Sequence, residues 1–388
     1  MPKRRANGEG SIFQRKDGLW AAQYTDNTGT KRTLYGKTQQ IVKAKLKEAI
    51  KHSDNGLVVD KSKVTFADWL TEWLEVYQKP TVRESTHIRA CKRIKNHIIP
   101  AFPKVLLKDL RADMLQRFFN EKAVGSRQDG KEGGLSVSEL YNMRQIISQA
   151  LNQAIENNII LTNVADKVKL PKKTKPEIAV LTIEEQRLLE NVLINYRNPL
   201  SFMILLDLYT GLRAGELIGL KISDIDFEKK EITIRRSVGR IDMPNGDRRS
   251  KKVVTEPKTL KGKRCIPLPV FLVEKLKVYI AERNEFVEAM APIWSEAIVR
   301  GNSIYPKMGD GWKDEGNVFV TRFGTQPEAS LLRKMLNDCL KQAGVRHINF
   351  HALRHTFATR CIEMGFDVRS LADILGHTDA KMTLNTYD

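Results

Sequence analysis

The chain has 388 residues, 41% of them hydrophobic and 29% charged, so it is too long for a single compact core and too apolar for a disordered protein. Its 65 Lys and Arg residues outnumber 46 Asp and Glu residues, which gives a formal net charge of +19. This excess favours polyanionic partners, chiefly nucleic acid, or an anionic membrane surface, over the alternative of a basic protein with no such partner.

Residues 1–52 hold twelve Lys and Arg residues against four Asp and Glu residues. The pattern predicts three short strands that turn at RKDG and DNTG, because Asp-Gly and Asn/Gly pairs tolerate positive φ, followed by a helix over 38–51. A small basic sheet suits insertion into a DNA groove, so residues 1–55 are expected to bind DNA; a structural hairpin with a solvated charged face is the alternative. The candidate contacts with DNA are Arg15, Lys16, Lys31 and Arg32.

Residues 64–168 are expected to form a helical bundle after a polar linker at 52–63. Thr65 and Asp68 have capping-box spacing, and the apolar residues that follow repeat with a helical period. Further amphipathic helices are predicted over 83–97, 109–121 and 136–157. Basic residues expected on the solvent side of this bundle, facing phosphates, are Arg83, Arg89, Lys92, Arg93 and Lys95.

A third domain is expected over 177–388, after the Pro- and Lys-rich stretch LPKKTKPEIAVLT. Its pattern predicts helices around one group of strands near 231–268. The fold class expected for the whole chain is therefore multidomain α+β: a three-stranded sheet with a helix, an all-α bundle, and a mainly α domain with a small β-sheet. The stretches 238–255 and 288–317 are longer than simple connections need.

Two motifs of the third domain carry candidate chemistry. In YTGLRAGELIGL, Arg213 lies near a helix start, where it can join backbone N–H groups in holding an anion, and Glu216 can orient it. Taken alone, this spacing is better explained by a solvated Arg–Glu pair. EPKTLKGKRCIPL, residues 256–268, predicts a hairpin that turns at 261–263, with Lys258 just before the turn.

The C-terminal region concentrates histidines: four of the seven lie between His347 and His377. His351 and Arg354 are three residues apart, so both can reach one bound group from the same helical face. His351 and His355 have zinc-ligand spacing, but the HExxH pattern needs Glu where this chain has Ala352, so no metal is expected. His355 is expected to be a packing residue.

Together these residues suit the transfer of a phosphodiester. Arginines can bind the non-bridging oxygens bidentately, and histidines can bind them or move protons. A lysine can protonate the departing alkoxide, and a tyrosine can act as nucleophile once its proton is removed. No carboxylate cluster for Mg²⁺ is evident, so side chains are expected to supply the positive charge.

TGLRAGE, the lysine of PKT, HALRH, LGH and the terminal TYD together resemble, in order and spacing, the tyrosine recombinases, and within them the integrases of temperate phages and conjugative transposons. The resemblance implies that DNA strands are cut and rejoined through a 3′-phosphotyrosyl intermediate, without metal or ATP. It implies Arg213 and Arg354 as phosphate clamps and Lys258 as general acid. His351 and His377 become phosphate and proton-transfer partners, Glu216 a supporting acid, and Tyr387 the nucleophile.

The resemblance also implies double-stranded DNA as partner, with residues 1–55 on arm sites and residues 64–168 on core sites. It further implies a tetramer on DNA and accessory DNA-bending or excision factors. The chain stops one residue past Tyr387, whereas members of the family usually continue into a short tail that packs on a neighbouring protomer. Two alternatives stay open: a type IB topoisomerase-like enzyme and a non-catalytic DNA-binding protein on the same fold.

A membrane or secreted protein is not expected. No apolar run approaches the roughly 18 residues of a spanning helix, and the basic N-terminus MPKRRANGEG is not followed by the apolar segment of a secretory signal. The scattered cysteines, Cys91, Cys265, Cys339 and Cys361, predict reduced thiols. The expected location is the cytoplasm of a bacterial host cell.

Overall fold

The computed structural model describes residues 10–25, 30–54, 63–125, 132–174, 179–196, 198–242, 250–256, 262–295, 299–300, 303–304 and 312–376. The chain divides into two compact units, one of residues 1–175 with 242–246 and one of the remainder. The expected α+β class is confirmed, with helices predominating and small antiparallel sheets in both units. Among the described residues no helix is long and apolar enough to cross a membrane.

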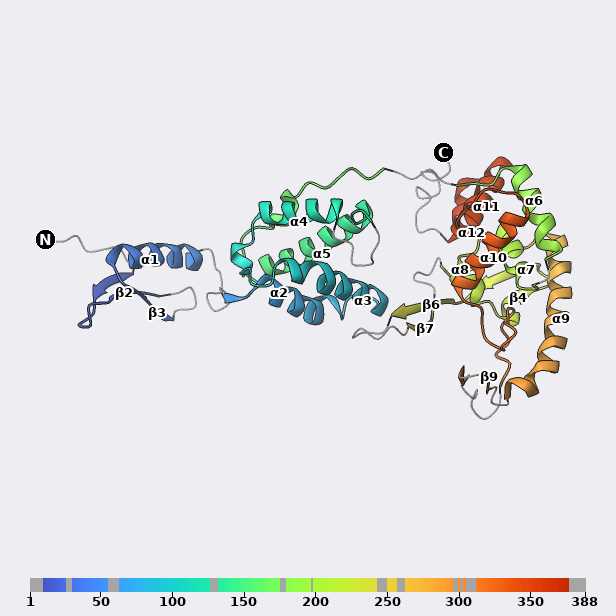
Figure 1. Ribbon diagram of the computed structural model, residues 1–388, viewed down its shortest axis with the longest axis horizontal. Helices are drawn as coiled ribbons and strands as arrows, with labels where there is room; N and C mark the ends of the chain where they lie inside the picture. The colour runs from blue at the N-terminus through green and yellow to red at the C-terminus, as the bar shows by residue number, and fades with distance from the viewer. Residues whose placement is uncertain are drawn as a thin grey trace. The chain divides into compact units, whose positions relative to one another are not determined.

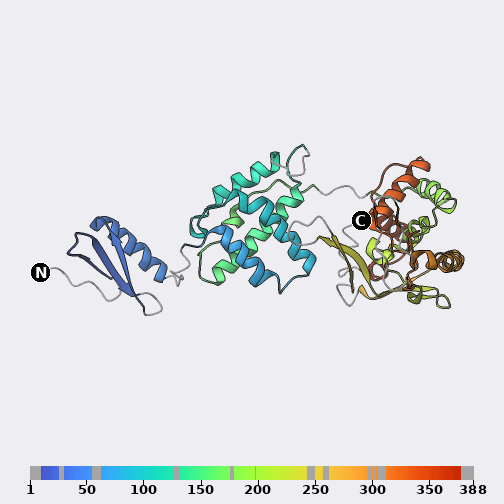
Figure 2. The same cartoon turned by 60° about the horizontal axis from the view of Figure 1, so that its bottom comes forward.

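The first unit begins with the expected antiparallel sheet and helix: β1 Ser11–Gln14, β2 Trp20–Thr25, β3 Lys31–Gly36 and α1 Gln39–Asp54. Helix α1 lies along one face of the sheet (Figures 1 and 2), and Ala22, Tyr24, Val42 and Leu46 form a small core between them. The turn predicted at RKDG is confirmed, because Gly18 has φ +81° and its N–H donates to the Arg15 carbonyl at 3.0 Å. The turn predicted at DNTG lies outside the described residues.

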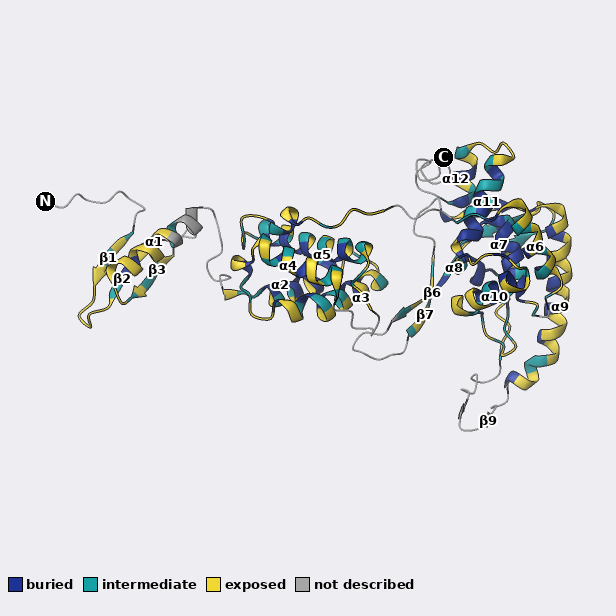
Figure 3. Ribbon diagram, turned by 45° about the horizontal axis from the view of Figure 1, so that its top comes forward, coloured by how far each residue is buried: buried dark blue, intermediate teal, exposed yellow. Residues whose placement is uncertain are grey.

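The helices predicted after the linker are confirmed, with shifted ends: α2 Phe66–Trp73, α3 Glu84–Arg93, α4 Ala112–Val124 and α5 Val137–Glu156. A π-helical turn extends α2 over Leu74–Gln78 and another extends α3 over Ile94–Ile98, while short 3₁₀ segments cover Ile99–Ala101, Leu107–Asp109 and Val164–Lys167. Thr65 caps α2 as predicted, accepting the Asp68 N–H at 3.1 Å. Buried aromatic and aliphatic residues of these helices form a core of this region's own, and the helices carry buried residues, dark blue in Figure 3, beside exposed ones.

The second unit packs helices around a buried central helix, α7 Ser201–Thr210, which touches α6 Ile183–Ile194, α10 Ala329–Gln342 and α11 His351–Glu363. Its other helices are α8 Ala214–Ile218, α9 Val270–Ser295 and α12 Val368–Leu375. Helix α9 runs along the edge of this unit, and α11 and α12 are neighbours (Figure 1). The capping box predicted between Thr182 and Glu185 is present at the start of α6.

The strands of the second unit are β4 Ile225–Asp226, β5 Glu231–Ile234, β6 Ser237–Asp242, β7 Ser250–Thr255, β8 Arg264–Pro267, β9 Val299–Arg300 and β10 Ser303–Ile304. The first strand of the hairpin predicted over residues 256–268, with Lys258, lies outside the described residues apart from Glu256, and its return strand is present as β8. Strand β7, which ends at Thr255, pairs with β6, whereas β8 pairs with β5. Part of the long stretch 238–255 is accounted for by the β6–β7 pair.

Candidate active site

Arg213 lies immediately before α8, as the sequence predicts, and Glu216 holds it there. The Arg213 backbone N–H donates to Glu216 Oε2 at 3.0 Å, and Nη1 of its guanidinium donates to Oε1 of the same carboxylate at 2.9 Å. The Arg213 side chain is 41% exposed, whereas that of Glu216 is 5% exposed. The predicted orientation of Arg213 by Glu216 is therefore confirmed, and one edge of the guanidinium faces solvent.

Arg354 projects from α11 and is almost completely buried, with 2% of its surface exposed. Its Nη1 donates to the Gly211 carbonyl at 2.7 Å, and its Nη2 donates to the Leu375 carbonyl at 2.5 Å. Gly211 ends α7 with φ +59°, and a Cβ there would lie 2.5 Å from the Phe357 ring. Only glycine fits this left-handed, crowded position, which explains why the arginine motif begins with Thr-Gly.

The two arginines meet at the carboxyl end of α12. Arg213 Nη2 donates to the Gly376 carbonyl at 3.1 Å, next to the Leu375 carbonyl that Arg354 binds. A third arginine, Arg264 of β8, donates through Nε to the Ile374 carbonyl at 2.5 Å. Three successive carbonyls at the negative end of the helix dipole therefore accept from three guanidinium groups.

Glu216 is the carboxylate that Arg213 and Arg264 share. Arg264 binds it bidentately, Nη2 to Oε2 at 2.8 Å and Nη1 to Oε1 at 3.2 Å. Burial alone would raise the pKa of Glu216, but the hydrogen bonds and charge of Arg264, with the charge of Arg213, lower this pKa to about 2. Glu216 therefore remains ionised at neutral pH and holds both arginines.

Arg264 escaped the sequence analysis, although its strand carried a signal. In RCIP the exposure alternates, so that Arg264 and Ile266 are buried whereas Cys265 and Pro267 face solvent. An arginine at the inward position of a short strand needs a buried partner. The sequence does not identify that partner, because Glu216 lies far upstream on α8.

Asp207 is a second residue that the sequence analysis missed. It is the only acidic residue in the apolar helix α7, it is fully buried, and neither carboxylate oxygen has a hydrogen-bond partner in the part of the chain described. Burial raises the pKa of Asp207 well above its usual range, against the opposing charge of Arg354. Three guanidinium groups thus face at most two carboxylates, which leaves the site with net positive charge suited to an anion.

His351 and His355 begin α11, and their rings meet edge to face with centroids 4.7 Å apart. Loss of hydration, then the positive charges of Arg354 and Arg213, lower the pKa of His351. Burial, His351 and Arg354 lower the pKa of His355 to about 4. Both imidazoles are therefore mainly neutral near pH 7, so His351 can accept a proton beside the two arginines.

The structure thus brings Arg213, Glu216, His351 and Arg354 into one site. Lys258, His377 and Tyr387 lie outside the described residues. The described chain nevertheless ends at Gly376, which caps α12 with φ +65°, directly before His377. The described residues contain no group of three or more potential metal ligands.

The candidate DNA-binding residues of the first unit differ in exposure. Arg15, Lys16 and Lys31 are exposed on the sheet and its turn, whereas Arg32 is half-buried; Arg83, Arg89, Lys92 and Lys95 are exposed along α3 and its π-helical extension. The prediction that Arg93 faces solvent is wrong. It is half-buried and donates to Glu139 of α5 at 2.5 and 2.9 Å, so this guanidinium ties two helices together.

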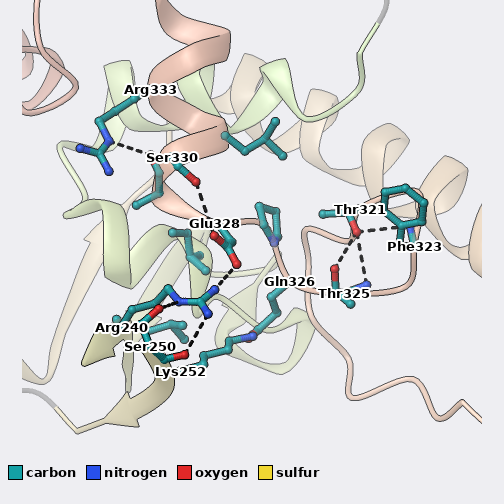
Figure 4. A pocket seen from close by; sticks show the side chains of 16 residues that line it. Arg240, Ser250, Lys252, Thr321, Phe323, Thr325, Gln326, Glu328, Ser330 and Arg333 are labelled. Carbon is teal, nitrogen blue, oxygen red and sulfur yellow. Dashed lines mark hydrogen bonds and ion pairs between the residues drawn. The ribbon is translucent and has the colours of Figure 1, made fainter. Parts of the chain in front are cut away.

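A pocket of about 1030 Å³ lies elsewhere in the second unit, between the β6–β7 pair and the start of α10. Figure 4 shows Arg240 reaching toward Glu328 and Ser250 across this pocket, and these contacts are an ion pair with Glu328 and hydrogen bonds to Ser250. None of the predicted catalytic residues lines it. The arginine site and this pocket are therefore separate features.

Known proteins show the same organisation. The model of the phage integrase family matches residues 180–388, and that of the phage integrase N-terminal SAM-like domain matches residues 65–123. A tyrosine recombinase XerC-like protein of Caldanaerobacter subterraneus subsp. tengcongensis is 31% identical over 371 residues, which cover 92% of this chain and 87% of the relative.

Two solved structures share the fold. The Tn1549 transposon integrase, in complex with a circular intermediate DNA, has a TM-score of 0.64 at 21% identity and covers 84% of this chain and 95% of its own. The lambda integrase tetramer bound to a Holliday junction has a TM-score of 0.55 at 18% identity. The match covers 99% of this chain and 97% of the lambda integrase chain. The family resemblance seen in the motifs is thus confirmed, and the chain belongs to the phage integrase family of tyrosine recombinases.

Proposed function

We propose that this recombinase integrates and excises a mobile element by cutting and rejoining DNA through a 3′-phosphotyrosyl intermediate on Tyr387. The observation that carries the proposal is the convergence of Arg213 and Arg354 on the end of α12, one residue before His377. Two guanidinium groups held together can stabilise the charge that develops on the non-bridging phosphate oxygens. Because side chains supply this charge, the proposed reaction needs no metal.

In the proposed step, Tyr387 Oη attacks the phosphorus and the bond from phosphorus to the 5′ oxygen breaks. His351, whose pKa is lowered by burial and by Arg354 and Arg213, accepts the tyrosine proton, and Lys258 donates a proton to the departing 5′ oxygen. His377 completes the phosphate contacts. A 5′-hydroxyl of another strand then reverses the step and restores Tyr387, so that one phosphodiester is exchanged for another without ATP.

We assign the three parts of the chain distinct tasks: residues 1–55 bind arm sites, residues 64–168 bind the core site, and residues 177–388 carry the chemistry. The separate hydrophobic cores of these parts support the division. The working assembly is a tetramer on double-stranded DNA with accessory DNA-bending or excision factors, in the cytoplasm of the host cell. The tetrameric lambda integrase of the same fold supports this assembly.

A plasmid assay tests the function as a whole. One supercoiled plasmid carries paired attachment sites taken from the DNA flanking the gene, and a second lacks them. The proposal predicts recombinant products from the first plasmid and no relaxation of the second. Relaxation of both plasmids without recombinants would instead indicate a type IB topoisomerase-like enzyme, and binding without any cleavage would indicate a non-catalytic protein.

Deleting residues 1–55 is expected to weaken binding to arm sites and to spare binding to the core site. The deleted segment includes residues 1–52, which carry a net charge of +8, and it has its own small core, so its loss removes phosphate contacts without exposing the core of the bundle. Footprinting of both kinds of site on one DNA fragment measures the effect. Equal loss of protection at arm and core sites would contradict the division of tasks.

Lys258→Ala is expected to slow cleavage of normal DNA and to be rescued by a 5′-bridging phosphorothiolate substrate. The thiolate leaves without a proton, so an enzyme that lacks its general acid should cleave this substrate at nearly the wild-type rate. Lys263→Ala is a matched control, because Lys263 is exposed and ion-paired with Glu256 at 3.7 Å. Equal defects of Lys258→Ala on both substrates would remove Lys258 from this role.

A further inference from the structure

Arg264 connects three parts of the site that are distant in sequence. It projects from β8, whose partner in the sheet is β5, with Arg264 opposite Ile234. From there it binds both oxygens of Glu216 on α8 and the Ile374 carbonyl at the end of α12. Its side chain is 5% exposed, as is that of Glu216, so this ion pair lies away from solvent.

The Arg264 side chain packs closely against Gly376 at the end of α12. A Cβ at Gly376 would lie 3.0 Å from Arg264 Nη1 and 3.1 Å from its Cδ, and the left-handed backbone of Gly376 also disfavours any other residue. The arginine therefore packs against the residue that turns the chain from α12 into His377. A lysine at position 264 could supply one positive charge but not the two-pronged contact with Glu216 together with the contact to Ile374.

Arg213 depends on this arrangement because Glu216 serves both arginines. Glu216 Oε1 accepts from Arg213 Nη1 and from Arg264 Nη1, and Oε2 accepts from the Arg213 backbone and from Arg264 Nη2. The carboxylate that holds Arg213 is therefore also held by Arg264. Arg264 is well placed to transmit any change in β8 to Arg213 and to the start of the segment that carries Tyr387.

We propose that Arg264 is a positioning residue for DNA cleavage, which sets Arg213 through Glu216. It does not touch the DNA in this proposal, because it is buried beneath Glu216. The inference rests on the proposed cleavage chemistry, with Arg213 as a phosphate contact.

Arg264→Lys tests the proposal against a matched control, Arg283→Lys. Arg283 is also a buried arginine of the second unit, 3% exposed in its side chain, and it binds Asp314 bidentately at 2.5 and 2.6 Å without contacting the site. In both variants a buried arginine loses a two-pronged ion pair, so both are expected to lower the melting temperature. The fraction folded and the affinity for core-site DNA are measured first, and cleavage is then compared at saturating enzyme.

The expected result separates the two variants by rate alone. Arg264→Lys should bind core-site DNA within a few-fold of wild type and cleave it about 10²-fold more slowly, because a displacement of about 1 Å at a catalytic group costs roughly that much. Arg283→Lys should cleave at the wild-type rate per folded molecule. A cleavage rate of Arg264→Lys within a few-fold of that control would overturn the proposal.

A double-mutant cycle that combines Arg264→Lys with Arg213→Lys tests whether Arg264 acts on cleavage through Arg213. If Arg264 acts through Arg213, the two losses in cleavage rate overlap, and the double variant is only slightly slower than Arg213→Lys. Losses that multiply would show that Arg264 acts independently of Arg213 and would contradict the positioning route. A wild-type protein that cleaves no core-site DNA would instead refute the proposed function, so the two failures are distinguishable.

Discussion

Tyr387→Phe is expected to abolish covalent attachment of the protein to DNA while leaving folding and core-site binding at the wild-type level. The substitution removes only the phenolic oxygen, which is the atom that forms the bond to phosphorus in the proposed step. Every contact proposed between the DNA and Arg213, Arg354 or the first unit is retained. Covalent complexes on a nicked suicide substrate, separated on a denaturing gel, give the measurement.

Tyr209→Phe is the control for this variant. Tyr209 belongs to the same unit and ends the helix that leads into Gly211, but its hydroxyl donates to Glu190 at 2.7 Å. Burial and that carboxylate raise the pKa of Tyr209 beyond its usual range, which makes it a poor nucleophile. The control should therefore form the adduct. A persistent adduct in Tyr387→Phe would assign the attack to another residue.

Arg213→Lys is expected to lower the cleavage rate by about 10²–10³-fold, because removing one preorganised hydrogen-bond donor to a developing oxyanion costs roughly that much. The affinity for core-site DNA should stay within a few-fold of wild type. Lysine keeps the charge but cannot bind Glu216, the Gly376 carbonyl and a phosphate with one planar group. Single-turnover cleavage at saturating protein separates this loss from any loss of binding.

Arg235→Lys is the control for the Arg213 variant. Arg235 is more than half exposed and lies 3.4 Å from Asp224, an ion pair that none of the proposed catalytic residues joins. It should cleave like wild type. If Arg213→Lys also cleaves within a few-fold of wild type, Arg213 does not contact the transition state.

Local patterns were sufficient to predict much of this structure. The Arg213–Glu216 pair, the caps at Thr65 and Thr182 and the helix over α11 all depend on residues three or four positions apart, which a helix brings together regardless of the rest of the chain. The division into a basic sheet, a bundle and a third region was predicted from composition and turn residues, which are also local properties of the sequence.

Contacts between distant segments were not predictable in this way. Strand β8 was expected as the return strand of a hairpin over 256–268, but its pairing with β5, whose residues lie well upstream, could not be inferred from local sequence. Arg93 has the helical position of a surface residue, yet Glu139 of α5 binds it. Arg264 and Asp207 could be recognised as members of the site only from the three-dimensional structure, in which α7, α8, β8 and α12 come together.

The most direct test of the account is to identify the amino acid that joins the DNA. Wild-type protein is trapped on a nicked suicide substrate, digested with protease, and the DNA-linked peptide is mapped by mass spectrometry. The account predicts a peptide from the C-terminal end of the chain with the 3′ phosphate on Tyr387. Attachment at any other residue would contradict it.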